Sequence, residues 1–538
     1  MQSSILLVLW AAIAIFIYRF AQYVLVELRH SRNAKRLGCV DPPRFVNYDY
    51  LGLYTVYKSL QADGKRDLMG LIQEFWQNVR KRESEIKNQN LLTVRQTLLG
   101  GRSVVTIEPK NIQAILATQF KDFGLGERRN GNFEPLLGRG IFSSDGERWS
   151  HARALLRPQF VRDQVSDLEL EEQHMQNLMR MLPVGKDRWT SVINIQPLFF
   201  KLTIDSATEF LFGESVDSQL ADLPGYTYQN PIAKDFPFHF DRAQTAIAQG
   251  IRLQDMYKLA HTKQMKDDCR VCHNFIDHYV RKALSKSKTS SQVTSSGKQR
   301  YVLLDALAES TSDPLELRYH MLSILLAGRD TTASTISFAF MYLAQRPDIY
   351  ARLRAIILDT FGSRSHPRSI TFEGLKNCNY LQWVLNETLR LQPVVPIDWR
   401  QALVDTTLPT GGGPDGTSPI YIRKGDNVDY QIYIMQRRTD LWGADAEVFR
   451  PERWEGRKFG WEFLPFNGGP RICVGQQFAL TEAAYVIVRL LQRFERMEGV
   501  GNSWEPVEKG GEGFVRTTVT LTMAPADGVK VRFMEAAE

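Results

Sequence analysis

Residues 466–475 read Phe466-Asn467-Gly468-Gly469-Pro470-Arg471-Ile472-Cys473-Val474-Gly475, and a helix is predicted directly after them, from about residue 476 to residue 494. Cys473 therefore lies between a loop and a helix, where N–H groups of the first helical turn can stabilise a thiolate. Arg471 adds a nearby positive charge. Gly469 permits a tight turn, and Gly475 leaves space for a flat cofactor to approach the backbone. We therefore predict that Cys473 is a thiolate ligand in a cofactor site.

A second informative segment is a long helix predicted over residues 314–345. Asp313 supplies a cap and Pro314 occupies the first turn. At about 1.5 Å per residue this helix is as long as a whole domain, and its apolar middle, residues 321–328, predicts a place in the core. Glycine inside a helix costs about 1 kcal/mol relative to alanine. The sequence Ala-Gly-Arg-Asp-Thr-Thr at residues 327–332 therefore indicates a function beyond packing.

Together with three further motifs, these two segments resemble the cytochrome P-450 superfamily, in which all five occur in the same order. The haem-binding loop of that family, F-x-x-G-x-R-x-C-x-G, matches residues 466–475. The resemblance covers nearly the whole chain. It implies a mainly α-helical fold with small β-sheets (α+β) and a single large haem domain. The other matching motifs are W-x-x-x-R at 149–153, A-G-x-D-T-T at 327–332, E-x-x-R at 387–390 and F-R-P-E-R-W at 449–454.

The resemblance assigns several residues to the binding of haem b. Cys473 is implied as the axial ligand of the haem iron, where a thiolate favours cleavage of the O–O bond. The other residues implied in haem binding are Trp149, Arg153, Arg400, Phe466, Arg471 and Gly475.

The Asp-Thr pair of the long helix is implied to serve oxygen activation. In the family, the helix opens locally above the haem, Thr331 hydrogen-bonds the reacting oxygen and Asp330 relays protons to it. Members that isomerise or dehydrate peroxides often lack this pair, so its presence favours hydroxylation of a substrate.

Three charged residues are implied to form a buried network. Glu387, Arg390 and Arg453 are assigned to folding and haem retention, not to chemistry. A buried ion pair must be fully hydrogen-bonded, because the loss of one partner costs roughly 3–5 kcal/mol.

The N-terminus predicts a membrane anchor. The first eighteen residues carry no charged side chain, and residues 5–17 form a continuous apolar run. A membrane-spanning helix needs about 20 residues, which are available if Arg19 snorkels and residues 20–26 continue the helix. Basic residues follow the run and none precedes it, so the body is predicted to be cytosolic. The alternative, a cleaved signal peptide, lacks a basic start and a clear cleavage site. We predict an anchor at 1–28, a basic, Pro-rich hinge at 29–45 and a catalytic domain at 46–538.

Composition narrows the possible partners. A formal net charge of +7 without a long Lys/Arg run does not suggest nucleic acid. Five irregularly spaced cysteines do not suggest a disulfide framework.

A second haem-related motif is present: Cys269-Arg270-Val271-Cys272-His273 matches the C-x-x-C-H pattern of c-type haem attachment. That alternative is disfavoured because attachment needs an extracytosolic compartment.

Three other segments carry structural predictions. Residues 92–107 contain apolar and β-branched stretches typical of a small sheet. The Ser/Thr-rich residues 285–298 are predicted to form a surface loop. The Gly-rich residues 410–418 are predicted to form a turn. A phosphate-binding loop is not expected there, because the sequence predicts neither a strand before the segment nor a helix with Lys-Ser/Thr after it.

Several stretches look like the fungal alkane and fatty-acid hydroxylases within this superfamily. The resemblance implies terminal (ω) hydroxylation of a hydrophobic, long-chain aliphatic or fatty-acid substrate by an enzyme of the endoplasmic-reticulum membrane. It also implies electrons from NADPH through NADPH–cytochrome P-450 reductase, with cytochrome b5 as a further partner. Arg148, Arg157, Arg489 and Arg493 are candidates for the reductase-docking face. The stretches are 111–123, 155–160, 203–216 and 464–482.

One departure from that branch lies after Pro396. Where those enzymes usually carry polar, uncharged residues, this chain has Asp398 and Trp399. These side chains would reshape or polarise the pocket if they face inward. The departure keeps open an alternative substrate, a fungal polyketide or terpenoid. We expect the pocket to be lined by Leu136, Leu137, Ile141, Phe142, Leu326 and Val395.

Overall fold

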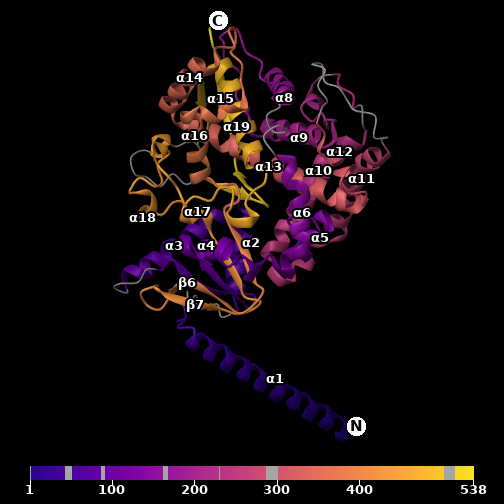
Figure 1. Cartoon of the computed structure of the whole chain (residues 1–538), viewed down its shortest axis with the longest axis vertical. Coiled ribbons are helices and arrows are strands. Elements are labelled where there is room, and N and C mark those ends of the chain that lie inside the picture. The colour runs from indigo at the N-terminus through magenta and orange to yellow at the C-terminus, as the bar shows by residue number, and fades with distance from the viewer. Residues whose placement is uncertain are drawn as a thin grey trace.

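The computed structural model describes residues 2–42, 51–85, 91–160, 168–223, 225–228, 231–285, 301–501 and 515–537. Helices form most of the molecule and small sheets lie among them, as predicted, while one long helix, α1, projects away from the body (Figure 1). The predicted Ser/Thr-rich loop at 285–298 lies outside the described residues, apart from Ser285 at the end of a helix.

The helices differ widely in length, from single turns to the 35 residues of α1. In chain order they are α1 (Gln2–Arg36), α2 (Leu53–Gly64), α3 (Leu68–Glu85), α4 (Pro109–Gln113), α5 (Gly126–Leu137), α6 (Gly146–Leu156), α8 (Glu169–Arg180), α9 (Gln196–Phe212), α10 (Pro231–Arg252), α11 (Lys263–Ser285), α12 (Leu303–Ala308), α13 (Pro314–Gln345), α14 (Pro347–Phe361), α15 (Phe372–Asn377), α16 (Asn379–Leu391), α17 (Ile432–Met435), α18 (Thr439–Trp442) and α19 (Gln476–Arg493).

Within the described residues, the strands are short and form four small sheets. They are β1 (Thr93–Leu98), β2 (Gly101–Thr106), β3 (Phe123–Gly124), β4 (Ile193–Asn194), β5 (Asp398–Ala402), β6 (Thr406–Gly412), β7 (Ser418–Ile422), β8 (Asn427–Tyr430), β9 (Phe494–Gly499), β10 (Thr517–Val519), β11 (Met523–Pro525) and β12 (Lys530–Glu535).

Helix α13 crosses the core with the bounds predicted from the sequence. The Asp313 side chain accepts a hydrogen bond from the N–H of Leu315 at 2.9 Å, which satisfies a donor at the helix start. The helix packs against α9 on one side and α19 on another. Almost all of its residues between Leu317 and Leu343 are buried, so most of its apolar middle lies in the core, as predicted.

The largest sheet positions residues near 398. Its strand order is β1-β2-β8-β5-β3, and the segment predicted as a small sheet forms the hairpin of β1 and β2. Strand β5 runs antiparallel to β8 and pairs Asp398 with Tyr430 and Trp399 with Asp429. This register places residues 398 and 399 directly beside residues 430 and 429.

The predicted Glu-Arg-Arg network is present and buried. The carboxylate of Glu387 accepts two hydrogen bonds from Arg390 at 2.8 Å each and one from Arg453 at 3.3 Å. The Trp454 indole N–H also donates to it, at 3.1 Å. Arg390 further donates to the carbonyls of Gln436 and Ala446 at 2.9 and 2.6 Å. These bonds tie α16 to the segment that leads toward Cys473.

Helix α1 carries the predicted anchor and continues beyond it. Among the described residues it is the one helix long and apolar enough to cross a membrane, over Ile5–Arg36. The helix does not end at residue 28, so the first part of the predicted hinge is helical. Its C-terminal half contacts the β6–β7 hairpin. There the Glu27 carboxylate pairs with both terminal nitrogens of Arg423, and His30 Nδ1 lies 3.2 Å from the Tyr421 hydroxyl.

Candidate functional site

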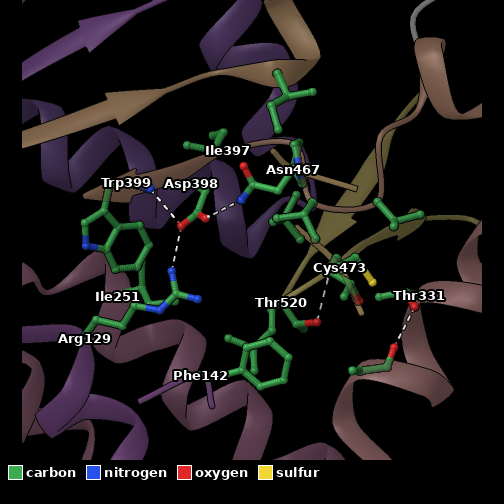
Figure 2. Close-up of a pocket in the computed structure, with 18 of the residues that line it drawn as sticks. Arg129, Phe142, Ile251, Thr331, Ile397, Asp398, Trp399, Asn467, Cys473 and Thr520 are labelled. Atoms are coloured by element: carbon green, nitrogen blue, oxygen red, sulfur yellow. Dashed lines mark hydrogen bonds and ion pairs between the residues drawn. The ribbon is translucent and has the colours of Figure 1, made fainter. Parts of the chain in front are cut away.

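A cavity of about 940 Å³ lies between α5, α13, β5 and the loop before α19. Its walls are mainly apolar. Figure 2 shows Cys473 and Thr331 toward one side of the view and Trp399 toward the other. The cavity also continues to α2 and α3, where Tyr54 and Phe75 line it. Ligand pockets usually measure about 300–1,000 Å³, so this one can accommodate a cofactor together with an apolar ligand.

The loop before α19 holds Cys473 rigidly at the cavity wall. The Cys473 N–H donates to the Phe466 carbonyl at 2.9 Å and closes the loop. Gly469 has a φ of +66°, and a Cβ there would lie 1.9 Å from the Leu116 carbonyl oxygen, so only glycine fits. At Gly475, which lines the cavity, a Cβ would approach only the Phe160 ring, at 3.7 Å. The cavity side of this residue is therefore open, as a flat cofactor requires.

The sulfur of Cys473 is open to the cavity and enclosed by protein elsewhere. Burial raises the pKa of the Cys473 thiol, whereas a hydrogen bond from the Gly475 N–H and the charge of Arg153 lower it. The predicted stabilisation by an N–H group at the helix start is present. The predicted cation, Arg471, does not have this effect on Cys473. Arg153 takes that position, because α6 places it over the loop, where it donates to the Ile472 carbonyl at 2.7 Å.

Arginines gather next to this loop. The Arg471 guanidinium lies 4.4 Å from the ring centroid of Trp149 and donates to Asp145 at 2.8 Å. Arg129 and Arg400 both bind Asp398, at 2.6 and 2.8 Å. Figure 2 shows Asp398 held between Arg129 and Asn467.

This cluster has more positive than negative charge. Burial, followed by repulsion from Arg400, lowers the pKa of Arg471 to about 9. The Nε atoms of Arg129 and Arg471 are buried and have no hydrogen-bond partner among the described residues. An anionic group with two carboxylates, such as the propionates of haem, would supply the missing charge and acceptors. The cluster consists of Arg129, Arg153, Arg400 and Arg471 against the carboxylates of Asp145 and Asp398.

Helix α13 brings Thr331 to the cavity but not Asp330. The Thr331 hydroxyl donates to the Ala327 carbonyl at 2.6 Å, and α13 is continuous here. The predicted local opening of the helix is therefore wrong for this structure. Asp330 lies on the flank toward α10, 3.5 Å from Arg329 and hydrogen-bonded to Gln244. Burial raises the pKa of the Asp330 carboxyl.

A family model provides the decisive comparison: that of cytochrome P-450 matches residues 68–523. This chain belongs to the cytochrome P-450 family. It is 47% identical to cytochrome P-450 monooxygenase g430 from a Fusarium species over 530 residues, 97% of this chain and 90% of the relative. It is 43% identical to cytochrome P-450 52E1 of Candida apicola over 521 residues, 95% of this chain and 96% of the relative. It is also 43% identical to cytochrome P-450 52A5 of Candida maltosa over 529 residues, 97% and 95% of the two chains.

Family membership establishes the class of chemistry. Cytochromes P-450 are haem monooxygenases that act with NADPH-derived electrons delivered through a reductase, and this chain is one of them. Its site fits that cofactor, because a thiol faces the cavity, an excess of buried positive charge lies beside it and an open glycine follows the thiol. When bound, haem supplies the iron at which molecular oxygen is activated.

The two cysteines of the rival haem motif in this cytochrome P-450 are buried in the helical core. Cys269 and Cys272 face inward from α11, and burial raises the pKa of Cys269 to about 12. His273 contacts the Leu136 carbonyl at 2.9 Å. Within the described residues no group of His, Cys, Asp or Glu side chains has the arrangement of a metal site. The two thiols therefore act as small apolar side chains.

The pocket predictions for this cytochrome P-450 were mostly right. Ile141, Phe142, Leu326 and Val395 line the cavity, whereas Leu136 and Leu137 are fully buried in the neighbouring core. The reason lies in helical geometry: Leu136 and Leu137 end α5 on its inner face.

Asp398 and Trp399 both line the cavity. Asp398 does not present a free charge there, because its carboxylate forms ion pairs with Arg400 and Arg129 at 2.8 and 2.6 Å. Burial raises the pKa of the Asp398 carboxyl, but the charges of these two arginines outweigh it and hold the pKa well below the usual range. The Tyr430 hydroxyl donates to the same carboxylate at 2.9 Å.

Sequence reasoning missed Arg129, which follows no fixed spacing from the haem loop.

Two arginines proposed for reductase docking serve the fold instead: Arg489 binds Glu172 at 2.7 and 2.8 Å, and Arg493 binds Glu535 at 3.0 Å. Arg148 and Arg157 are exposed on or next to α6.

Proposed function

We propose that this cytochrome P-450 inserts one oxygen atom of O2 into a C–H bond at or near the end of a long aliphatic chain, carried by a hydrocarbon or a fatty acid. The observation that supports this most is the cavity, which has Cys473 and Thr331 at one side and continues between apolar walls toward α2 and α3. An extended apolar substrate fits this shape, and its end would approach the thiolate side.

Each polar residue has a role in this proposal. Cys473 ligates the haem iron, and Phe466 and Gly475 shape the space next to it. Trp149 stacks on Arg471, and Arg153, Arg400 and Arg471 bind the propionates, with Arg129 as an addition. In the reaction, the Thr331 hydroxyl would exchange its hydrogen bond to the Ala327 carbonyl for one to the reacting oxygen, and Asp330 would bring protons from the α10 side after a side-chain rotation.

The surroundings of the enzyme are part of the same proposal. Residues 1–28 anchor the chain in the endoplasmic-reticulum membrane, residues 29–45 join the anchor to the body, and residues 46–538 form the cytosolic catalytic domain. NADPH–cytochrome P-450 reductase and cytochrome b5 are the proposed electron donors. Arg148 and Arg157 remain candidates for the docking face, because both side chains are exposed.

One argument for the alternative substrate, a polyketide or terpenoid, no longer holds. A free carboxylate at Asp398 would have suited an oxygenated ligand, but Arg129 and Arg400 neutralise it. Trp399 remains at the cavity wall, where it narrows the space available to a bulky ring system.

The ligand assignment is tested by the spectrum of the reduced, CO-bound protein. The wild type and Cys272→Ala should both show the red-shifted Soret band of thiolate ligation, and Cys473→Ala should lose it. If Cys473→Ala keeps the band, or if haem stays covalently attached after denaturation, the assignment is wrong.

The substrate proposal is tested by turnover of the reconstituted enzyme with reductase and NADPH. A saturated fatty acid and the matching alkane should yield terminal or near-terminal alcohols. Turnover of polyketides or terpenoids with none of aliphatic chains would contradict it.

A further inference from the structure

Arg128 is a cation at the cavity wall that Asp398 does not neutralise. It lies on α5 next to Arg129, and its guanidinium faces the Trp399 ring with 5.4 Å to the centroid. Its terminal nitrogen donates to the neutral side chain of Gln254, in the 3₁₀ helix Gln254–Ala260. Arg129, by contrast, binds Asp398 at 2.6 Å.

The environment of Arg128 lacks a direct ion pair. Among the described residues, no carboxylate oxygen lies within 4.0 Å of its guanidinium, and only Asp429 and Asp255 act on it, from longer range. Burial is the largest influence and lowers the pKa of Arg128. The Asp429 carboxyl accepts a hydrogen bond from Ser103, and burial raises its pKa. Arg128 is therefore a partly desolvated guanidinium with unused donors.

Such a group selects carboxylates. A guanidinium presents a planar fork of donors that matches the two oxygens of a carboxylate, and hydrogen bonds between charged groups are roughly twice as strong as neutral ones. A desolvated cation gains more from an incoming anion than an exposed one, because burial has already removed most of its water.

The position of Arg128 also suits a substrate head group. Its guanidinium stacks on the Trp399 ring, and Trp399 lies toward the side of the cavity away from Cys473 and Thr331 (Figure 2). The lining of the cavity as a whole is mainly apolar, with Phe142, Ile141 and Leu326 among its residues. A chain whose head lies at Arg128 would therefore direct its far end toward the reaction site at Thr331.

We propose that Arg128 binds the carboxylate of a long-chain acid substrate and so fixes which carbon atoms reach the reactive centre. This inference rests on the proposed function and narrows it, because it makes the acid, and not the hydrocarbon, the preferred substrate. Arg128 acts as a specificity-determining residue and takes no part in the chemistry.

The test compares a saturated C16 acid, its methyl ester and hexadecane in spectral titrations of the haem-loaded full chain. In wild type the acid should bind about tenfold or more tighter than the ester, in line with a charge-assisted hydrogen bond. Arg128→Gln should weaken binding of the acid by about tenfold and leave the ester and hexadecane within twofold, and Arg128→Lys should restore part of the loss. Arg270→Gln removes the same charge from an exposed site on α11 and should change nothing.

Product analysis provides an independent readout. With the head group released, Arg128→Gln should spread oxidation of the acid over more in-chain positions, while the products from hexadecane stay the same. Equal losses for all three ligands, or an unchanged preference for the acid in Arg128→Gln, would overturn the inference and leave the proposed function standing. Failure of the wild type to bind or oxidise any of the three would overturn both.

Discussion

Asp398 connects two arginines of the haem site, and its removal has a calculable cost. Its carboxylate binds Arg129 and Arg400, and all three side chains are at least 85% buried. Asp398→Asn should therefore leave two cations without a counter-charge and lower the free energy of unfolding by roughly 3–5 kcal/mol. We expect a lower thermal midpoint and weaker haem retention, measured by absorbance during heating.

A matched control is Asp415→Asn, because Asp415 lies in an exposed turn and bonds only to Thr417 in the same turn. This variant should melt with the wild type. If Asp398→Asn also melts with the wild type, the two arginines have enough other partners, and the account of Asp398 given above is wrong.

At the scale of single residues, the sequence was informative where a motif is contiguous. Cys473, Gly469 and Gly475 lie in one short loop, so their spacing alone predicted their relation. Arg129 contacts the same site from a helix more than 300 residues earlier in the chain, and no local pattern distinguishes it from Arg128. The register of β5 on β8, which sets where Asp398 points, depends on long-range pairing that the sequence does not reveal.

At the scale of elements, α13 offers a comparison between two similar hydroxyls. Thr331 and Ser337 each donate to the carbonyl four residues earlier, at 2.6 and 2.7 Å, but only Thr331 lines the cavity. Thr331→Ala should therefore uncouple oxygen consumption from product formation, with several-fold more reduced oxygen species per turnover. Ser337→Ala should stay coupled. The measurement is the ratio of product to NADPH consumed, and normal coupling in Thr331→Ala would contradict the proposed role.

A second prediction at this scale concerns the link between α16 and the segment before the haem loop. Glu387→Gln leaves Arg390 and Arg453 buried beside a neutral group and should cost roughly 3–5 kcal/mol, with a low yield of haem-loaded protein. Glu134→Gln breaks an exposed Glu-Arg pair on α5, with both side chains more than half exposed, and should cost under about 1 kcal/mol. Similar stabilities of the two variants would contradict the importance of burial.

The bounds of α13 followed from the sequence because the cap at Asp313, the first-turn proline at Pro314 and Pro347 just beyond the end of the helix are local signals. The continuity of the helix past Gly328 did not follow from the sequence. The helix remains unbroken there, and the Thr331 hydroxyl adds a hydrogen bond to the Ala327 carbonyl. Likewise, the i,i+3 spacing of Glu387 and Arg390 predicted a shared helix face. The carbonyls of Gln436 and Ala446, which complete the network, come from another part of the chain.

At the scale of the whole molecule, α1 should determine membrane attachment. A chain that starts after Arg36 loses the apolar span, so it should leave the membrane fraction at high pH or high salt to a much greater extent than the full chain. Flotation with vesicles measures this. The CO-bound spectrum of the shortened chain should be unchanged, because in the described part of the chain the hydrogen bonds of α1 to the body go to Arg423 and Tyr421, which do not line the cavity. Equal flotation of the two chains would contradict the anchor.

The sequence predicted the anchor and the class of fold at this scale, because an apolar run and a set of ordered motifs are visible without coordinates. The contact of α1 with the β6–β7 hairpin was not predictable. It depends on Glu27 and Arg423, which are nearly 400 residues apart, and on a helix that continues past the predicted start of the hinge.

The contact between α1 and the β6–β7 hairpin fixes the orientation of the proposed anchor relative to the catalytic body. A helix joined by a loose linker would let the body rotate freely over the lipid, but Glu27, His30 and Asn33 all touch the hairpin. A transmembrane helix changes its tilt when the hydrocarbon thickness of the bilayer changes. If α1 spans the bilayer, as proposed, a change of its tilt should also turn the catalytic body, because these hydrogen bonds join the two, and should thereby alter how readily substrates dissolved in the membrane reach the enzyme.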